Sequence, residues 1–140
     1  MKVLILIAIL LSAPFAECAD LLDTLRAEDI SGAHMTLNPG GAGIGFELEI
    51  AGDDPRLETL VDLLREAEPG GGHKCPNAGA IRFRMKDGGN IGIGLLPSHT
   101  EGLYGFRLFD GEEFLEPYIL NMKEFLEALA PLGVPLDDLE

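Results

Sequence analysis

The sequence predicts a single two-layer α+β domain, in which a mainly antiparallel sheet of five to six strands packs against two amphipathic helices after an N-terminal signal peptide. Several segments alternate apolar and polar residues between short turns, which is typical of an antiparallel sheet with one solvated face. Two other segments repeat their apolar residues with helical spacing. The chain of 140 residues is long enough for one hydrophobic core and too short for two ordinary domains.

The N-terminus has the pattern of a secretory signal peptide, which we expect over residues 1–18. Lys2 supplies a positive charge, residues 3–11 form an uninterrupted apolar run, and small residues follow near Ala16. This run is far shorter than the roughly 20 residues that a membrane-spanning helix needs. We therefore predict an exported protein, periplasmic or extracellular, without a transmembrane segment.

The site of signal cleavage decides the chemistry of the two cysteines, Cys18 and Cys75. Cleavage after Ala16 keeps Cys18 in the mature chain, where it could form a disulfide with Cys75 in an oxidising compartment. Cleavage after Cys18 removes that partner. Lipidation of Cys18 requires a small residue before it, and Glu17 does not fit that requirement. The sequence leaves the disulfide open.

The composition excludes several classes of protein. The sequence has 10 Lys+Arg against 24 Asp+Glu, which gives a formal net charge of −14. Nucleic acids and anionic membranes are bound mainly through clustered cations, so this charge argues against both partners. An apolar share of 46% is too high for a disordered chain. Two cysteines are too few for a disulfide-dense mini-protein or a Cys-rich zinc module.

The expected domain covers residues 19–133 and begins with a short helical segment, a hairpin and a helix. Leucines in residues 20–27 suit one or two helical turns. Residues 30–37 and 45–50 follow as two strands, of which the second alternates strictly. Asp54 is suited to cap the helix that comes next. The apolar stripe of that helix consists of Leu57, Leu60, Val61 and Leu64.

The sequence of the second half of the domain predicts another hairpin and an aromatic strand. Residues 81–86 alternate apolar and cationic side chains, and Asp87 with two glycines supplies the turn into a strand over 90–95. An aromatic strand is expected over 103–109, and a short strand near 114–119 completes the sheet.

The chain is expected to end with a second helix and a tail. Asn121 and Glu124 form a capping-box pattern at the start of this helix. Its apolar stripe consists of Met122, Phe125, Leu126 and Leu129. Residues 134–140 are expected to form an acidic, frayed tail.

The order of these elements resembles that of small exported or lipid-anchored bacterial α+β domains of unknown function. The resemblance is carried by the capped helix with its Leu-Val-x-Leu-Leu run, by the pattern Ile-x-Phe-x-Met-x-Asp-Gly over residues 81–88, and by an aromatic strand before a terminal amphipathic helix. It covers roughly residues 28–130. The resemblance implies an exported α+β domain and assigns no functional residues.

The most informative charged residues are four cations. Arg82, Arg84 and Lys86 alternate along one expected strand and therefore project from one face of the sheet. Arg107 is expected on the same face, because the aromatic and leucine residues beside it take the core side. Glycines in the neighbouring strands leave little side-chain bulk there.

This cationic group has two interpretations. It could recognise a carboxylate, a phosphate or an acidic segment of a partner. Alternatively, its members pair across the strands with Glu47 and Glu49, which is the commoner arrangement on exposed strands.

Other chemistry has less support in the sequence. His73, Cys75 and His99 could supply ligands to zinc or copper, but their spacing does not show that their loops converge. Ser98 beside His99 does not make a catalytic dyad, because the two side chains of a dyad must meet with a third group that orients the base. The glycines of residues 40–45 precede a strand rather than a helix, which argues against a phosphate loop.

We therefore predict an exported, acidic, non-catalytic binding module without a cofactor, such as an inhibitor, an immunity-type protein or a sensory accessory domain. It is expected to bind a protein partner or a small anionic ligand through Arg82, Arg84, Lys86 and Arg107. One alternative is a structural domain of the cell envelope without a discrete ligand. Another is a metal-binding or hydrolytic protein that uses His73, Cys75 and His99.

Overall fold

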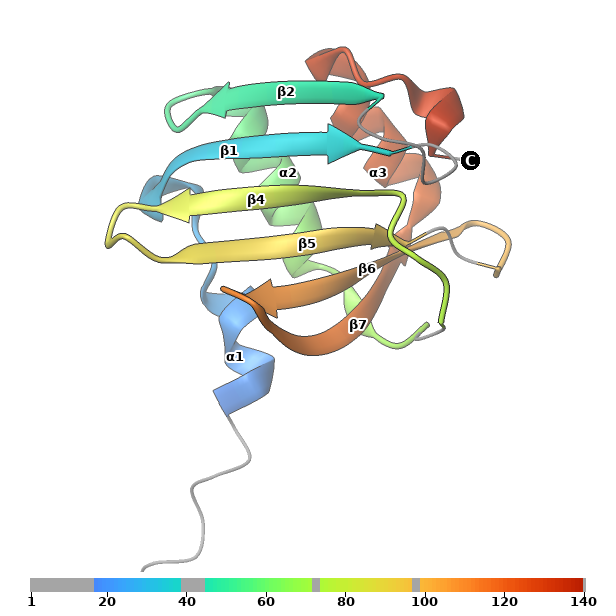
Figure 1. The fold of residues 1–140 in the computed structure, drawn as a ribbon, viewed down its shortest axis with the longest axis horizontal. Helices are drawn as coiled ribbons and strands as arrows, with labels where there is room; N and C mark the ends of the chain where they lie inside the picture. Colours follow the sequence, from blue (N-terminus) through green and yellow to red (C-terminus); the bar gives the residue numbers. More distant parts are fainter. Residues whose placement is uncertain (1–16, 39–44, 72–73, 97–98, 140) are drawn as a thin grey trace, which may run out of the picture.

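A seven-stranded antiparallel sheet with helices on one face forms the centre of the structure (Figure 1). This computed structural model describes residues 17–38, 45–71, 74–96 and 99–139. The strands are β1 (Ile30–Leu37), β2 (Phe46–Ala51), β3 (Glu68–Pro69), β4 (Gly79–Met85), β5 (Asn90–Leu96), β6 (Leu103–Asp110) and β7 (Glu113–Asn121). They lie in the order β2-β1-β4-β5-β6-β7-β3.

The two faces of the sheet differ because helices cover only one of them (Figure 1). The structure has three α-helices in its described residues. They are α1 (Glu17–Thr24), α2 (Pro55–Arg65) and α3 (Met122–Leu129). In Figure 1, α2 and α3 lie behind the sheet, and the face toward the reader is called here the outer face. No helix in the described parts of the chain is long and apolar enough to span a membrane.

The α+β class is confirmed, but the expected five to six strands are too few. The additional strand is β3, whose two residues pair with Ile119 and Tyr118 of β7. A two-residue strand is too short to produce an alternating pattern, so the sequence could not reveal it. The short helical segment expected over residues 20–27 is present as α1, which starts and ends three residues earlier than expected. It begins at Glu17, and residues 1–16, which carry most of the expected signal peptide, lie outside the described residues.

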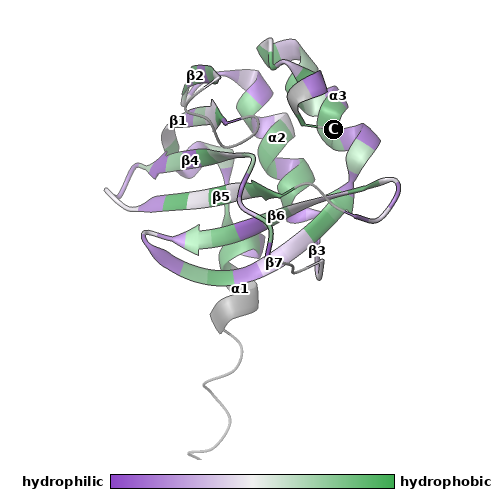
Figure 2. Cartoon of the chain, turned by 45° about the vertical axis from the view of Figure 1, so that its right-hand side comes forward, coloured by the Kyte–Doolittle hydropathy of each residue, from purple (hydrophilic) through white to green (hydrophobic). Residues whose placement is uncertain are grey.

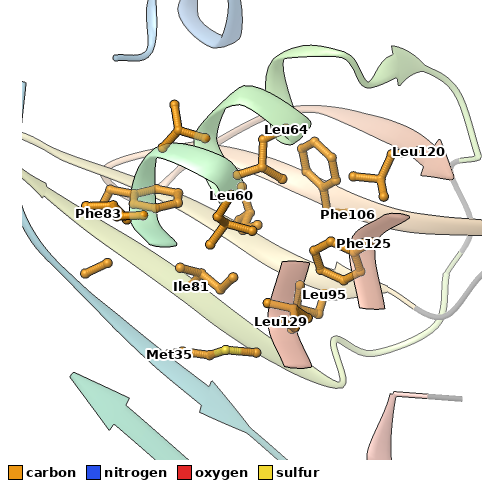
Figure 3. Close-up of a cluster of buried hydrophobic side chains, with 14 of the residues drawn as sticks. Met35, Leu60, Leu64, Ile81, Phe83, Leu95, Phe106, Leu120, Phe125 and Leu129 are labelled. Atoms are coloured by element: carbon orange, nitrogen blue, oxygen red, sulfur yellow. The ribbon is translucent and has the colours of Figure 1, made fainter. Parts of the chain in front are cut away.

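The core lies between the inner face of the sheet and the two amphipathic helices (Figure 3). The predicted apolar stripe of α2 is confirmed, since its four members are at most 1% exposed: Leu57, Leu60, Val61 and Leu64. From α3, Phe125 and Leu129 are fully buried. Burial of one such side chain contributes about 1.5–3 kcal/mol. Met122 and Leu126 of the predicted stripe are only partly buried and line a shallow apolar groove instead.

Both predicted helix caps are present. The Asp54 carboxylate accepts a hydrogen bond from the Arg56 amide at 2.9 Å. The Arg56 side chain and amide together lower the pKa of Asp54 to about 2. The Asn121 side chain accepts a hydrogen bond from the Glu124 amide at 3.1 Å. These contacts fix where α2 and α3 begin.

The strand register is the one that the alternation predicts. Ile81 and Phe83 of β4 are fully buried, whereas Arg82 and Arg84 are exposed on the opposite side. Figure 2 shows the same alternation as green and purple stretches along the strands. On β6, Arg107 takes the outward position between buried neighbours.

The C-terminal segment differs from the expected frayed tail. Val134 is 6% exposed and Leu139 is 1% exposed, and both belong to the core cluster. Gly133 adopts a left-handed conformation with φ 77°, which turns the chain after the 3-10 helix Ala130–Leu132. The few apolar residues among the acidic ones therefore hold this segment against the domain.

The core contains one hydroxyl group without a hydrogen-bond partner among the described residues, that of Tyr104. Its ring stacks on Phe125 with 4.9 Å between centroids, and the residue is 1% exposed. Burial raises the pKa of Tyr104 to about 12. Because the ionised form is disfavoured in the fold, the stability of the domain does not depend on this group below the ordinary pKa near 10 and falls as the pH rises from there toward 12.

We predict that Tyr104→Phe leaves the free energy of unfolding unchanged or raises it by about 1 kcal/mol, because it removes a buried hydroxyl without a partner. Urea unfolding at pH 7 measures this change. In a Tyr118→Phe background, the absorbance of tyrosinate at 295 nm should have its midpoint near 12. A destabilisation by Tyr104→Phe of more than about 1 kcal/mol would show instead that the hydroxyl has a partner.

Candidate functional site

The candidate site is the outer face of the sheet, where two rows of residues run across the strands. Residues directly opposite each other in antiparallel strands place their side chains on the same face. The central row consists of Glu49, His34, Arg82, Gly92, Phe109 and Phe114. The second row consists of Glu47, Thr36, Ala80, Gly94, Arg107 and Pro117.

The β2 end of the outer face is acidic, and its carboxylates already have partners. The Nε2 atom of His34 lies 2.6 Å from Oε1 of Glu47 and 3.9 Å from Oε1 of Glu49. The carboxylates remain well exposed, with side-chain exposures of 59% and 61%. His34 thus joins the two acidic residues of β2 from the neighbouring strand.

Arg84 also reaches this acidic end. Its Nη2 atom donates to Oε2 of Glu49 at 2.9 Å, although β1 lies between the two strands. The reach is possible because Gly32 of β1 has no side chain: a Cβ there would lie 2.5 Å from Nη2 of Arg84. The hydrogen bond from Arg84 lowers the pKa of Glu49, and the same bond raises the pKa of Arg84. For Arg84, the structure shows the cross-strand pairing that the sequence left open.

Arg107 holds a loop against the outer face. Its guanidinium donates to the Asn77 side chain at 2.9 Å and to the Cys75 carbonyl at 2.8 Å. Asn77 lies directly over Gly94, where a Cβ would be 2.4 Å from the amide nitrogen of Asn77. In Figure 1 this yellow-green segment, residues 74–78, precedes β4 and is called here the Arg107 loop.

The Arg107 loop also brings together two of the proposed metal ligands. Sγ of Cys75 lies 3.5 Å from Nε2 of His99, which comes from the connection between β5 and β6. His73, the third proposed ligand, lies outside the described residues. Within the described ranges, no group of three or more His, Cys, Asp and Glu side chains is arranged to hold a metal ion. The side chain of Cys18 is not described, so the expected disulfide stays a prediction.

Lys86 lies apart from the three arginines, in the turn beyond the end of β4. It lines a cavity of about 640 Å³ beside α1, together with carboxylates that include Asp29, Asp87 and Asp110. The predicted group of four cations is therefore divided by the structure into residues with different surroundings.

Arg82 differs from the other two arginines of the outer face. It is exposed, and in the part of the chain that the structure describes its side chain has no hydrogen bond or ion pair. Its neighbour across β5 is Gly92, which contributes no side chain. A Cβ added at Gly92 would make an ordinary van der Waals contact with Cβ of Phe109 at 3.8 Å, so this partly exposed position has room for a side chain.

The sequence reasoning missed an aromatic pair at the β7 end of the central row. Phe109 and Phe114 face each other across β6 and β7, with 5.7 Å between ring centroids in an edge-to-face geometry. Phe114 is 51% exposed and is the exposed large hydrophobic residue among those described. The signal was present in the alternation, because Phe109 is out of phase with the core positions of its strand.

Comparisons with protein-family models, with curated proteins and with solved structures give no match for this chain. The function proposed below is inferred from the residues of the outer face.

We predict that the carboxyl of Glu49 titrates below its ordinary pKa of 4.5 and that Arg84→Ala returns it toward that value. The pair then contributes stability above pH 4.5, and this contribution is lost as the pH falls through the lowered pKa of Glu49. NMR titration of the side-chain carboxyl carbon measures both values. Arg82→Ala is the matched control, and an equal effect of both substitutions would contradict the observed pairing.

We predict that Arg107→Gln loosens the Arg107 loop, because this guanidinium holds the loop at two points, the Asn77 side chain and the Cys75 carbonyl. Trypsin should then cut after Lys74 faster than in the unmodified protein, while the thermal midpoint changes little. Arg82→Gln removes an arginine from the same face without touching the loop and should leave the cleavage rate unchanged. Equal cleavage in both variants would mean that Arg107 does not hold the loop.

Proposed function

We propose that the protein is an exported, non-catalytic binding module that recognises a carboxylate of a partner protein through Arg82 on the outer face. Export is supported by the charged and apolar start of the sequence, and the binding role by the state of Arg82. Arg82 is exposed and has no hydrogen bond or ion pair within the described residues, whereas Arg84 and Arg107 are each held by other groups of the chain.

The chemistry of an arginine suits this role. A guanidinium offers five N–H donors in a planar fork and binds a carboxylate with two parallel hydrogen bonds. An exposed arginine that is not engaged within the chain can form this pair without first breaking another. Arg82 therefore has its full binding capacity available to a partner.

The overall charge of the protein supports the same conclusion. With a formal net charge of −14, most of the surface repels an acidic partner. A carboxylate of that partner is favoured only where a cation is exposed, and on the central row of the outer face that cation is Arg82. Electrostatic patterns of this kind affect specificity and association rate more than affinity.

The contact between Cys75 and His99 favours a second candidate function, binding of a soft metal ion. Two ligands leave at least one position of a zinc or copper site to be filled by another group. Metal analysis of the protein purified without an affinity tag tests this candidate. About one equivalent of metal per protein, lost in the Cys75→Ser variant, would support metal binding. Less than about a tenth of an equivalent would exclude this second function.

We predict that Arg82→Glu abolishes capture of the partner while the thermal midpoint moves little. A photo-reactive benzoylphenylalanine at Asn90, which is exposed beside Arg84 on the outer face, should cross-link the partner in cells that produce the protein. The same group at Thr59, exposed on α2 on the opposite side of the sheet, is the positional control.

The proposed function requires that the cross-link at Asn90 be lost in Arg82→Glu. It should be reduced less in Arg84→Glu, because Arg84 is already paired. Equal cross-linking from Asn90 and Thr59, or a cross-link that survives Arg82→Glu, would contradict recognition through the outer face. A large loss of stability in Arg82→Glu would show that this arginine serves the fold instead.

A further inference from the structure

The exposed aromatic pair suggests what else the partner must present, and this inference rests on the proposed function. A single exposed apolar residue is normal on a protein surface. Here, however, Phe114 packs edge-to-face on Phe109, and both rings lie in the same central row as Arg82. The row therefore ends in an apolar platform of two rings.

The distance between Arg82 and this platform follows from the sheet. Arg82 lies on β4 and Phe109 on β6, two strands apart, which corresponds to about 10 Å at the usual strand spacing. Gly92 lies between them on β5 and has no side chain, so the sheet surface between Arg82 and Phe109, called here the floor, is bare backbone at its centre. A ligand that touches both ends must therefore span about 10 Å across an open floor.

The Arg107 loop borders this floor on one side. Asn77 covers Gly94, the next outward glycine of β5, and Arg107 fixes it there. Gly92 has no such cover, since the nearest atom to an added Cβ is 3.8 Å away. The open floor is thus limited to the central row, with a cation at one end and two aromatic rings at the other.

We propose that the outer face binds a segment of a partner protein that carries a carboxylate and a large apolar side chain about 10 Å apart. The carboxylate binds Arg82, the apolar side chain packs on Phe109 and Phe114, and the backbone between them crosses Gly92. In an extended segment, residues two apart on one face are separated by about 6.7 Å, and the lengths of the two side chains supply the rest.

A polypeptide segment fits this geometry better than a small ligand. Small ligands are held in concave sites that bury most of their surface. Here the two recognition groups are far apart on a floor that lacks a side chain at its centre. A chain segment gains from both groups at once, and aromatic and arginine residues are the common anchors of such interfaces.

A second copy of this chain is a less suitable occupant. Two copies would each bring a net charge of −14. The carboxylates that the outer face itself could offer, Glu47 and Glu49, are already held by His34 and Arg84. The partner is therefore expected to be a different protein.

Capped peptides with the sequence Ser-Glu-Gly-Phe-Ser, amidated at the C-terminus, test the proposal on the complete folded domain. Titration followed by ¹H–¹⁵N NMR should shift the amides of Gly92 and Phe109 and the Nε–H of Arg82. Arg82→Gln and Phe114→Ser should each weaken binding at least about tenfold. Arg84→Gln and Phe114→Tyr are the matched controls and should bind as the unmodified protein does.

The peptides themselves carry the second set of controls. Replacement of Glu by Gln, or of Phe by Ala, should weaken binding about as much as the corresponding change in the protein. If the Phe-to-Ala peptide binds equally well, or if no peptide shifts Gly92, the two-ended site is wrong. The proposed function still stands in that case when the cross-link from Asn90 depends on Arg82. A dimer that dissociates in Arg82→Glu would overturn the choice of occupant.

Discussion

The contact between the inner face of β4 and helix α2 determines what the opposite face of the sheet presents. Ile81 and Phe83 are buried against the α2 side, where Leu60 and Leu64 lie (Figure 3). Side chains alternate along a strand, so burial of these two residues forces their arginine neighbours outward. A shift by one residue would bury two guanidinium groups and expose two core residues, which no part of the domain could compensate. The outer face is therefore a consequence of the core.

Glycines on the outer face then determine which contacts each of its arginines makes. Because Gly32 has no side chain, Arg84 reaches across β1 and donates a hydrogen bond to Glu49. Because Gly94 has none, Asn77 packs against the sheet, where Arg107 donates a hydrogen bond to it. Gly92 is left uncovered beside Arg82. A missing side chain thus permits an ion pair at Gly32 and a loop contact at Gly94, and it leaves the sheet surface accessible at Gly92. Only the last of these leaves an arginine and an aromatic platform available to another molecule, and for that reason we place recognition there.

Local features of the sequence predicted the fold well, whereas the site depends on contacts between distant segments. The caps at Asp54 and Asn121 and the alternation through Phe83 are encoded within a few residues, and all three are present. The ion pair of Arg84 could not be predicted from neighbouring residues in the sequence, because it depends on which residues of β1 and β2 lie beside Arg84 in the sheet. The approach of Cys75 to His99 likewise requires the packing of two loops. The short strand β3 and the buried C-terminal segment were missed because neither has a periodic pattern of its own.

The central claim is that the uncovered position at Gly92 is where another molecule binds. Gly92→Val tests it most directly, because the added Cβ meets its nearest atom at 3.8 Å and β-branched residues suit a strand. Gly94→Ala is the contrasting variant, since its Cβ would displace Asn77. The measurement is the yield of the Asn90 cross-link at an unchanged thermal midpoint. We expect Gly92→Val to fold normally and to lose the cross-link; a folded Gly92→Val protein that captures its partner as efficiently as before would contradict the account.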